Sequence, residues 1–254
     1  MGDLRQLEDC CEDEKLALKQ LKINLDFDEK FDMDDMTLIR FLRARNSDLK
    51  KTEAMISASL AWRTQYEIDD LIMWDPSVEI ASGFDIYHCG CDFEGRPVYY
   101  APLGMWASAK DLFDNGQEED CLRYAAKTMD MVYKDLLKTK HQNFVCIVDI
   151  AGATYRKALH ELQNFKGIQD LIWVFKEYEA NYPETLHKAF IINTPKVFYW
   201  GYNIVKPLMS ARTLSKIRIF ETSNASWQTE LRDLLPECAI PEIFGGSGKM
   251  TSFY

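Results

Sequence analysis

Long apolar runs are missing from this 254-residue chain: no stretch approaches the ~18 apolar residues of a membrane span. The first residues also lack the apolar core of a signal peptide. Positive charge is also scarce, because 30 Lys and Arg residues face 40 Asp and Glu residues and leave a formal charge of −10. Nucleic-acid binding requires a basic surface, so this balance argues against it. We therefore expect a soluble cytoplasmic protein.

Paired cysteines are missing too. The seven cysteines are an odd number, scattered singly apart from Cys10-Cys11, and this usage is typical of reduced thiols in a cytosolic protein. His88, Cys89 and Cys91 form the one cluster that resembles part of a zinc site. No second pair follows at metal-site spacing, so we expect no metal.

Catalytic motifs are represented only by partial matches. Residues 245–249, GGSGK, resemble a phosphate-binding loop, but Ile243 stands where the first glycine belongs and no helix follows. Asp149 ends an apolar strand, a common place for an active carboxylate, and a structural role in capping or bonding loop amides fits it equally well. We expect a protein without enzymatic activity.

The pattern of the chain predicts two parts and a short tail. Residues 1–75 read as a helical lobe, with an acidic stretch to about residue 35 and two helices between 35 and 66 that break at residues 46–48. Residues 76–248 alternate strands with helices, which predicts an α/β domain with a mixed, mostly parallel sheet. Residues 249–254 read as a C-terminal tail.

The segment 188–220 has an unusual composition, with six Lys or Arg residues and no carboxylate. Its opening apolar run predicts a strand, after which Thr194 offers a helix N-cap, Pro195 a first helical position and Pro207 a stop. The helix between the prolines is apolar on almost all sides. Either it is a buried core helix, or one face meets an apolar cavity and the other a membrane.

Eight short motifs in a fixed order resemble the CRAL-TRIO family of lipid-binding proteins. They are LIRFLRAR (38–45), DxxGRPV (92–98), DIAG (149–152), NYPE (181–184), IINTP (191–195), KP (206–207), TLSKI (213–217) and PxxFGG (241–246). The sequence is most similar to the subgroup that includes supernatant protein factor, whose members often carry a β-rich C-terminal domain that this sequence does not include.

The resemblance implies a sheet that floors a large apolar lipid cavity beneath a helical gate. The gate residues that it indicates are Phe198, Trp200, Tyr202, Val205 and Met209. Amphipathic aromatic rings suit such a gate, because they settle at the headgroup level of a bilayer.

The resemblance also implies ligand-binding residues. A phosphatidylinositol headgroup would be held by Arg45, Glu184, Thr213 and Lys216, although Glu184 and a nearby cation could equally form a plain ion pair. Asn46 stands where phosphatidylinositol-binding members tend to have a lysine. Phe144 and Cys146 replace hydroxyl side chains that help hold phosphatidylcholine, and Tyr99 is a further candidate wall residue.

We therefore expect a non-enzymatic protein that sequesters one lipid, either phosphatidylinositol or an isoprenoid such as a tocopherol, a retinoid or squalene. It would exchange this lipid during transient contact with membranes, as a cytoplasmic protein peripheral at their surface. We expect no cofactor other than the bound lipid. The alternative is a lipid-regulated sensor or scaffold that presents lipid to a partner protein.

Overall fold

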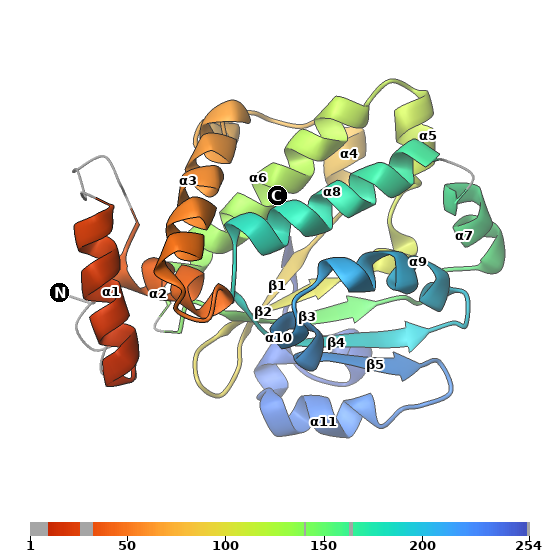
Figure 1. The fold of residues 1–254 in the computed structure, drawn as a ribbon. Helices are drawn as coiled ribbons and strands as arrows, with labels where there is room; N and C mark the ends of the chain where they lie inside the picture. The colour runs from red at the N-terminus through yellow and green to blue at the C-terminus, as the bar shows by residue number, and fades with distance from the viewer. Residues whose placement is uncertain (1–9, 26–32, 140, 163–164, 253–254) are drawn as a thin grey trace.

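The computed structural model describes residues 10–25, 33–139, 141–162 and 165–252 (Figure 1). Positions 1–9 and 26–32 of the predicted acidic stretch lie outside these ranges. The described residues form a helical lobe and an α/β domain with a mixed, mostly parallel sheet, as the sequence predicts.

The described part of the lobe contains three helices: α1 (Glu12–Asn24), α2 (Asp35–Ala44) and α3 (Leu49–Gln65). The carboxylates of Asp34 and Asp48 cap α2 and α3 by accepting hydrogen bonds from the backbone amides three residues on, at 2.7 and 3.1 Å. Asn46 and Ser47 take left-handed backbone angles between the two helices, with φ of 51° and 61°. The lobe has its own apolar core, which includes Leu21, Leu38, Leu42 and Ile56. The predicted helix pair is confirmed.

The sheet has six strands in the order β5-β4-β3-β2-β1-β6. Their bounds are β1 Tyr87–Cys91, β2 Pro97–Ala101, β3 Phe144–Asp149, β4 Leu186–Thr194, β5 Ile217–Glu221 and β6 Thr251–Ser252. Strands β2 to β5 are parallel, and β1 pairs antiparallel with both β2 and β6. The sixth strand therefore comes from the segment expected as a tail.

Helices cover both faces of the sheet (Figure 1). On one face lie α6 (Glu118–Leu136) and α8 (Phe165–Asn181), and on the other lies α11 (Trp227–Leu234). Side chains alternate along β3, so Val145 and Ile147 pack with Trp227 and Leu231 in the main core. Phe144 and Cys146 point to the opposite face, toward α6 and α8.

Shorter elements complete the described chain. They are η2 Leu71–Met73, α4 Val78–Gly83, η3 Leu103–Met105, α5 Ala109–Asp114, α7 Tyr155–Leu162, α9 Phe198–Val205, η4 Lys206–Leu208, α10 Ala211–Ser215, η5 Glu237–Ala239 and η6 Glu242–Phe244. Of these, α9 and η4 follow β4 and contact α8.

The helix after β4 begins later than predicted. Thr194 is not its N-cap: it is the last residue of β4, opposite Glu221 of β5, and its hydroxyl donates to the carbonyl of Phe220 at 2.9 Å. Pairing with the neighbouring strand satisfies this side chain and removes it from the helix end. Consequently Pro195 is not the first helical position, and α9 starts at Phe198.

Candidate functional site

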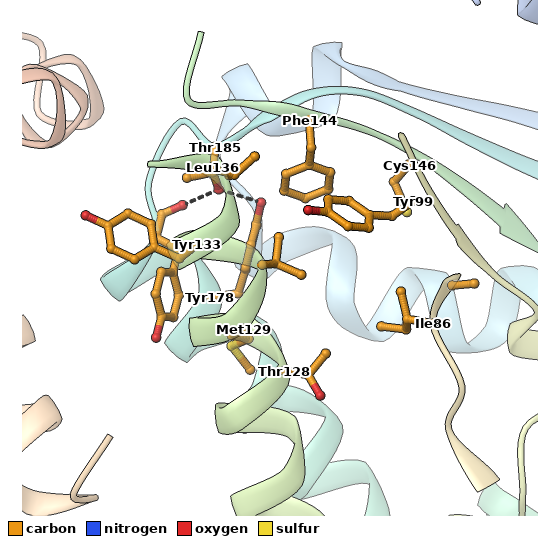
Figure 2. A pocket seen from close by; sticks show the side chains of 13 residues that line it. Ile86, Tyr99, Thr128, Met129, Tyr133, Leu136, Phe144, Cys146, Tyr178 and Thr185 are labelled. Carbon is orange, nitrogen blue, oxygen red and sulfur yellow. Dashed lines mark hydrogen bonds between the residues drawn. The ribbon is translucent and has the colours of Figure 1, made fainter. Parts of the chain in front are cut away.

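A cavity of about 170 Å³ lies between the sheet and helices α6 and α8 (Figure 2). Its walls are apolar or aromatic. The lining residues are Ile86, Tyr99, Ala101, Thr128, Met129, Val132, Tyr133, Leu136, Phe144, Cys146, Tyr178, Tyr182 and Thr185. Tyr99, Phe144 and Cys146, the candidate wall residues from sequence, therefore share one wall, with the Tyr99 and Phe144 rings 5.6 Å apart.

Four tyrosines line this cavity, and each of their hydroxyls has a hydrogen-bond partner. The pairs are Tyr99 with Asp135 at 2.7 Å, Tyr133 with Thr37 at 2.8 Å, Tyr178 with Thr185 at 2.9 Å and Tyr182 with Asp130 at 3.3 Å. Burial raises the pKa of all four phenols, so they stay protonated near neutral pH. With its polar atoms paired, the wall suits a hydrocarbon group.

Cys146 adds a thiol to the same wall without adding charge. Burial raises the pKa of this thiol to about 12, so it is protonated and poorly nucleophilic at neutral pH. The side chain acts as a small apolar surface.

The cavity floor continues past β3 toward β5. Strand register places Val148 beside Ile191 and Ile191 beside Ile219, all on the face that carries Cys146. These three side chains are only half-buried. Strands of a parallel sheet are normally buried on both faces. The half-buried part of this face therefore offers apolar surface beyond the residues that line the cavity.

Four of the five predicted gate residues lie in α9, and Met209 follows η4 directly. Val205 is buried and Trp200 is exposed, with 45% of its surface accessible. The Phe198 ring stacks on Tyr202 at 5.8 Å, and the Trp200 ring meets Tyr155 of α7 at 5.4 Å. Met209 is half-buried. None of these gate residues is among the described residues that line the cavity.

A second, polar recess adjoins the cavity at the amino end of β4. It is lined by Tyr178, Glu179, Tyr182, Pro183, Glu184, Leu186, Thr213 and Lys216. Tyr178 and Tyr182 line both the cavity and the recess, so they form the wall between them. Three of the four predicted headgroup residues, Glu184, Thr213 and Lys216, therefore meet in space.

Glu184 holds the centre of this recess. Its Oε2 accepts from Lys216 Nζ at 2.8 Å, and its Oε1 lies 3.6 Å from Nη1 of Arg212, a residue that the motifs do not include. The backbone of Glu184 is left-handed, with φ of 58°, in the turn between α8 and β4. That turn projects the carboxylate toward α10, where Thr213 lies in the middle of the helix and Lys216 just after its end.

Arg45 takes a different position from the other three. It lies at the end of α2, where its Nη1 donates to the carbonyl of Ala44 at 3.1 Å. Arg43, two residues earlier, forms a two-fold contact with Glu14 of α1, at 2.6 and 3.0 Å. The sequence could not predict which of these two arginines pairs with Glu14, because only the packing of α1 against α2 decides it.

Asp149 is structural in this arrangement. Its Oδ1 accepts from the Ala151 amide at 2.9 Å and from the Asn193 side chain at 2.8 Å, and its Oδ2 from the Tyr100 hydroxyl at 3.3 Å. Asn193 has a left-handed φ of 56° just before the chain leaves β4 for α9. Asp149 thus anchors the connection to the predicted gate.

The described residues show neither a metal-binding cluster nor a membrane-spanning helix. They contain no group of three His, Cys, Asp or Glu side chains that could hold a metal ion. Across the same ranges, no helix is both long and apolar enough to span a bilayer.

The fold and the two pockets define an α/β domain that places an apolar cavity next to a charged recess, with a helical lobe on one side. Family models match both parts: "CRAL/TRIO domain" matches residues 82–246, and "CRAL/TRIO, N-terminal domain" matches residues 4–58. The chain belongs to the CRAL/TRIO domain family.

Individual relatives agree with this assignment. The chain is 29% identical to "CRAL-TRIO domain-containing protein T23G5.2" of Caenorhabditis elegans over 97% of its own length and 34% of that protein. It is 32% identical to "Phosphatidylinositol/phosphatidylcholine transfer protein SFH12" of Arabidopsis thaliana over 86% of its own length and 40% of the relative. It thus spans less than half of these curated relatives.

A solved structure, Sfh5, has the same fold. It matches with a TM-score of 0.67 at 16% identity, over 88% of this chain and 84% of that one.

Proposed function

We propose that this protein binds one lipid, with hydrocarbon in the cavity and a polar headgroup at the recess, and transfers it between membranes. The observation that carries the proposal is the shared wall of Tyr178 and Tyr182, which sets an apolar cavity directly against the Glu184–Lys216 pair. A lipid is divided in the same way, into an apolar hydrocarbon part and a polar headgroup. The name of the Arabidopsis relative supports the assignment.

The energetics of a carrier explain why the cavity must be apolar. Each CH₂ group removed from water contributes about 0.8 kcal/mol, so an acyl chain in water is disfavoured by on the order of 10 kcal/mol. A pocket that matches the bilayer makes exchange nearly neutral in free energy. The rate of lipid exchange then depends on how readily the protein opens its cavity.

Size makes such an opening necessary. An engineered cavity of about 150 Å³ holds a molecule as small as benzene, and the cavity here is about 170 Å³. A whole lipid needs more room, and the half-buried floor at Val148, Ile191 and Ile219 provides it if α9 shifts away from α8. We assign the gate to α9 and η4, with Phe198, Trp200, Tyr202, Val205 and Met209.

The recess favours a phospholipid over an isoprenoid. Lys216 and Thr213 offer a cation and a hydroxyl to a phosphate, while Glu184 offers a carboxylate to hydroxyl groups of the headgroup. A tocopherol or squalene would leave these charged groups without a ligand. We therefore propose phosphatidylinositol as the ligand, with Arg45 at the edge of the site on the lobe.

Mass spectrometry of lipids extracted from the purified protein tests this function. We expect one phospholipid per protein, and accelerated transfer of fluorescent phosphatidylinositol between vesicles. Lipid-free protein that accelerates no transfer would contradict the proposal. Retained lipid without exchange would instead indicate a sensor or scaffold, and capture of a partner that requires residues 1–35 would then identify it.

A further inference from the structure

Glu184 faces two cations, and the second of them lies outside the motifs. Lys216 Nζ is 2.8 Å from Oε2, and Arg212 Nη1 is 3.6 Å from Oε1. The carboxylate is 15% exposed and the Arg212 side chain 49% exposed. Two cations thus share one carboxylate, and a second carboxylate, Glu179, lines the same recess beside the apolar cavity.

Arg212 also reaches the helical lobe. Its Nη2 donates to the Asn46 side-chain oxygen at 3.2 Å, across 166 positions of sequence. Asn46 lies in the left-handed turn between α2 and α3. The guanidinium therefore stands between the lobe and the turn that carries Glu184, with a neutral amide on one side and a long ion pair on the other.

The neighbouring arginines are engaged elsewhere. Arg43 makes its two-fold contact with Glu14, and Arg45 donates to a backbone carbonyl of its own helix. Arg212 is thus the guanidinium that faces Glu184 at close range among the residues that the structure describes.

The size of the recess decides where a headgroup can lie. Its free volume is about 10 Å³, roughly the space of a single water molecule. A sugar-sized headgroup cannot enter it and must rest on the rim. Arg212 does not line the recess itself, but its Nη1 lies 3.6 Å from Glu184 and its side chain is half exposed, which places it at this rim. Lys216 and Glu184 are more enclosed, at 24% and 15%.

We propose that Arg212 is a phosphate-binding residue of this site and makes it selective for a ligand that carries a phosphate ester on a polyol. This inference rests on the proposed function. The ion pair is long, at 3.6 Å, its guanidinium is half exposed, and Glu184 keeps Lys216 as a partner, so Arg212 can leave Glu184 at small cost. Its planar fork then binds two phosphate oxygens, while Glu184 keeps Lys216 and accepts from ligand hydroxyls.

Matched lipids test the proposal. Transfer of phosphatidylinositol and of diacylglycerol, which shares the acyl chains but lacks the phosphate, is measured between phosphatidylcholine vesicles. We expect Arg212→Gln to slow phosphatidylinositol transfer about tenfold and to change diacylglycerol transfer less than twofold. Arg212→Lys keeps the charge but loses the planar guanidinium, so its rate of phosphatidylinositol transfer should lie between those of the wild type and Arg212→Gln.

Two further variants control for charge and position. Arg218→Gln removes an equally exposed arginine that pairs with Glu230 at 2.7 Å on β5, and we expect no change in either transfer. Asn46→Lys combined with Arg212→Gln places an amine beside the vacated position and should recover part of the phosphatidylinositol transfer. Thermal unfolding of each variant confirms that it is folded.

Calorimetry with soluble inositol 1-phosphate separates a lipid headgroup from a free phosphate ester. If the wild type transfers no lipid but binds inositol phosphate tenfold more tightly than Arg212→Gln does, the lipid-transfer proposal fails and the role of Arg212 stands. Equal slowing of both lipids, increasing with anionic vesicles, would make Arg212 a membrane contact and overturn the inference. Unchanged transfer and binding in Arg212→Gln would overturn it as well.

Discussion

The hydroxyl of Tyr178 lies 2.9 Å from Oγ1 of Thr185, within the wall between the apolar cavity and the charged recess. Thr185 donates its own hydroxyl hydrogen to the carbonyl of Tyr182 at 2.8 Å, so Tyr178 is the donor of the pair. Figure 2 shows both bonds. The chain thus presents a tyrosine ring to the ligand space and directs its hydroxyl toward the protein.

Thr185→Val should therefore leave a buried hydroxyl without an acceptor. We expect a loss of about 2 kcal/mol in the free energy of unfolding, measured by urea denaturation, because an unpaired buried donor keeps its full desolvation cost. The double variant Tyr178→Phe/Thr185→Val removes both partners and should be more stable than Thr185→Val. Additive losses would show that the two hydroxyls are not coupled.

Lys216→Ala should weaken phosphatidylinositol transfer about tenfold or more, because a charged hydrogen bond contributes about 1.5–3 kcal/mol. A purely apolar ligand should transfer at nearly the wild-type rate. Lys51→Ala is the matched control, since Lys51 pairs with Asp48 on the lobe with 72% of its side chain exposed. Loss of both ligands in Lys216→Ala would indicate a structural role for Lys216.

Ala101→Leu should fill part of the cavity from β2, where Ala101 is buried against the open space. Added methyl groups in an existing cavity stabilise a fold, so we expect an equal or higher melting temperature together with less bound lipid. Mass spectrometry of extracted lipid measures the loss. Ala61→Leu, at an exposed position of α3, is the control. Unchanged lipid content in Ala101→Leu would place the ligand outside this cavity.

Trp200→Ser should slow transfer several-fold without unfolding the protein, because an exposed indole on α9 suits the headgroup level of a bilayer. Sedimentation with vesicles should show weaker binding. Phe93→Ser removes an aromatic side chain that is 67% exposed in the turn between β1 and β2, and should behave as wild type. Similar losses in both variants would mean that α9 has no special part in membrane contact.

Asp92 should make stability fall at acidic pH. Burial by itself would raise the pKa of this carboxyl, but the amides of Arg96 and Glu94 and the Arg96 guanidinium hold it below its usual value of 3.8. Because the folded pKa is the lower one, the stabilisation is fully present above about pH 4 and is lost as pH falls through the folded pKa.

Chemical denaturation between pH 7 and pH 3 measures this effect. Asp92→Asn should destabilise the protein by about 2–3 kcal/mol at neutral pH and flatten the acid dependence, because it removes the buried charge partner of Arg96 and leaves only the exposed Glu94. Asp75→Asn, an exposed carboxylate, should change neither property. An unchanged acid limb in Asp92→Asn would assign the loss of stability to other carboxylates.

Local sequence signals predicted much of the fold because they act over a few residues. The two lobe helices lie between residues 35 and 66 with a break at 46–48, as predicted, and Asp149 ends the apolar strand β3. Thr194 shows the limit of this approach, because its hydroxyl found the carbonyl of Phe220 in a neighbouring strand. A local cap signal cannot compete with a partner that only strand pairing supplies.

Sequence alone determined the helical lobe, the α/β class and the order of the motifs, since these follow from periodicity and short motifs, and the family resemblance carried by those motifs named Glu184, Thr213 and Lys216 as candidates. The tertiary structure decided the rest. It placed Arg212 between Asn46 and Glu184, turned the tyrosine hydroxyls out of the cavity and engaged Arg43 with Glu14. Those relationships join residues far apart in the chain, and no local pattern encodes which distant side chains will meet.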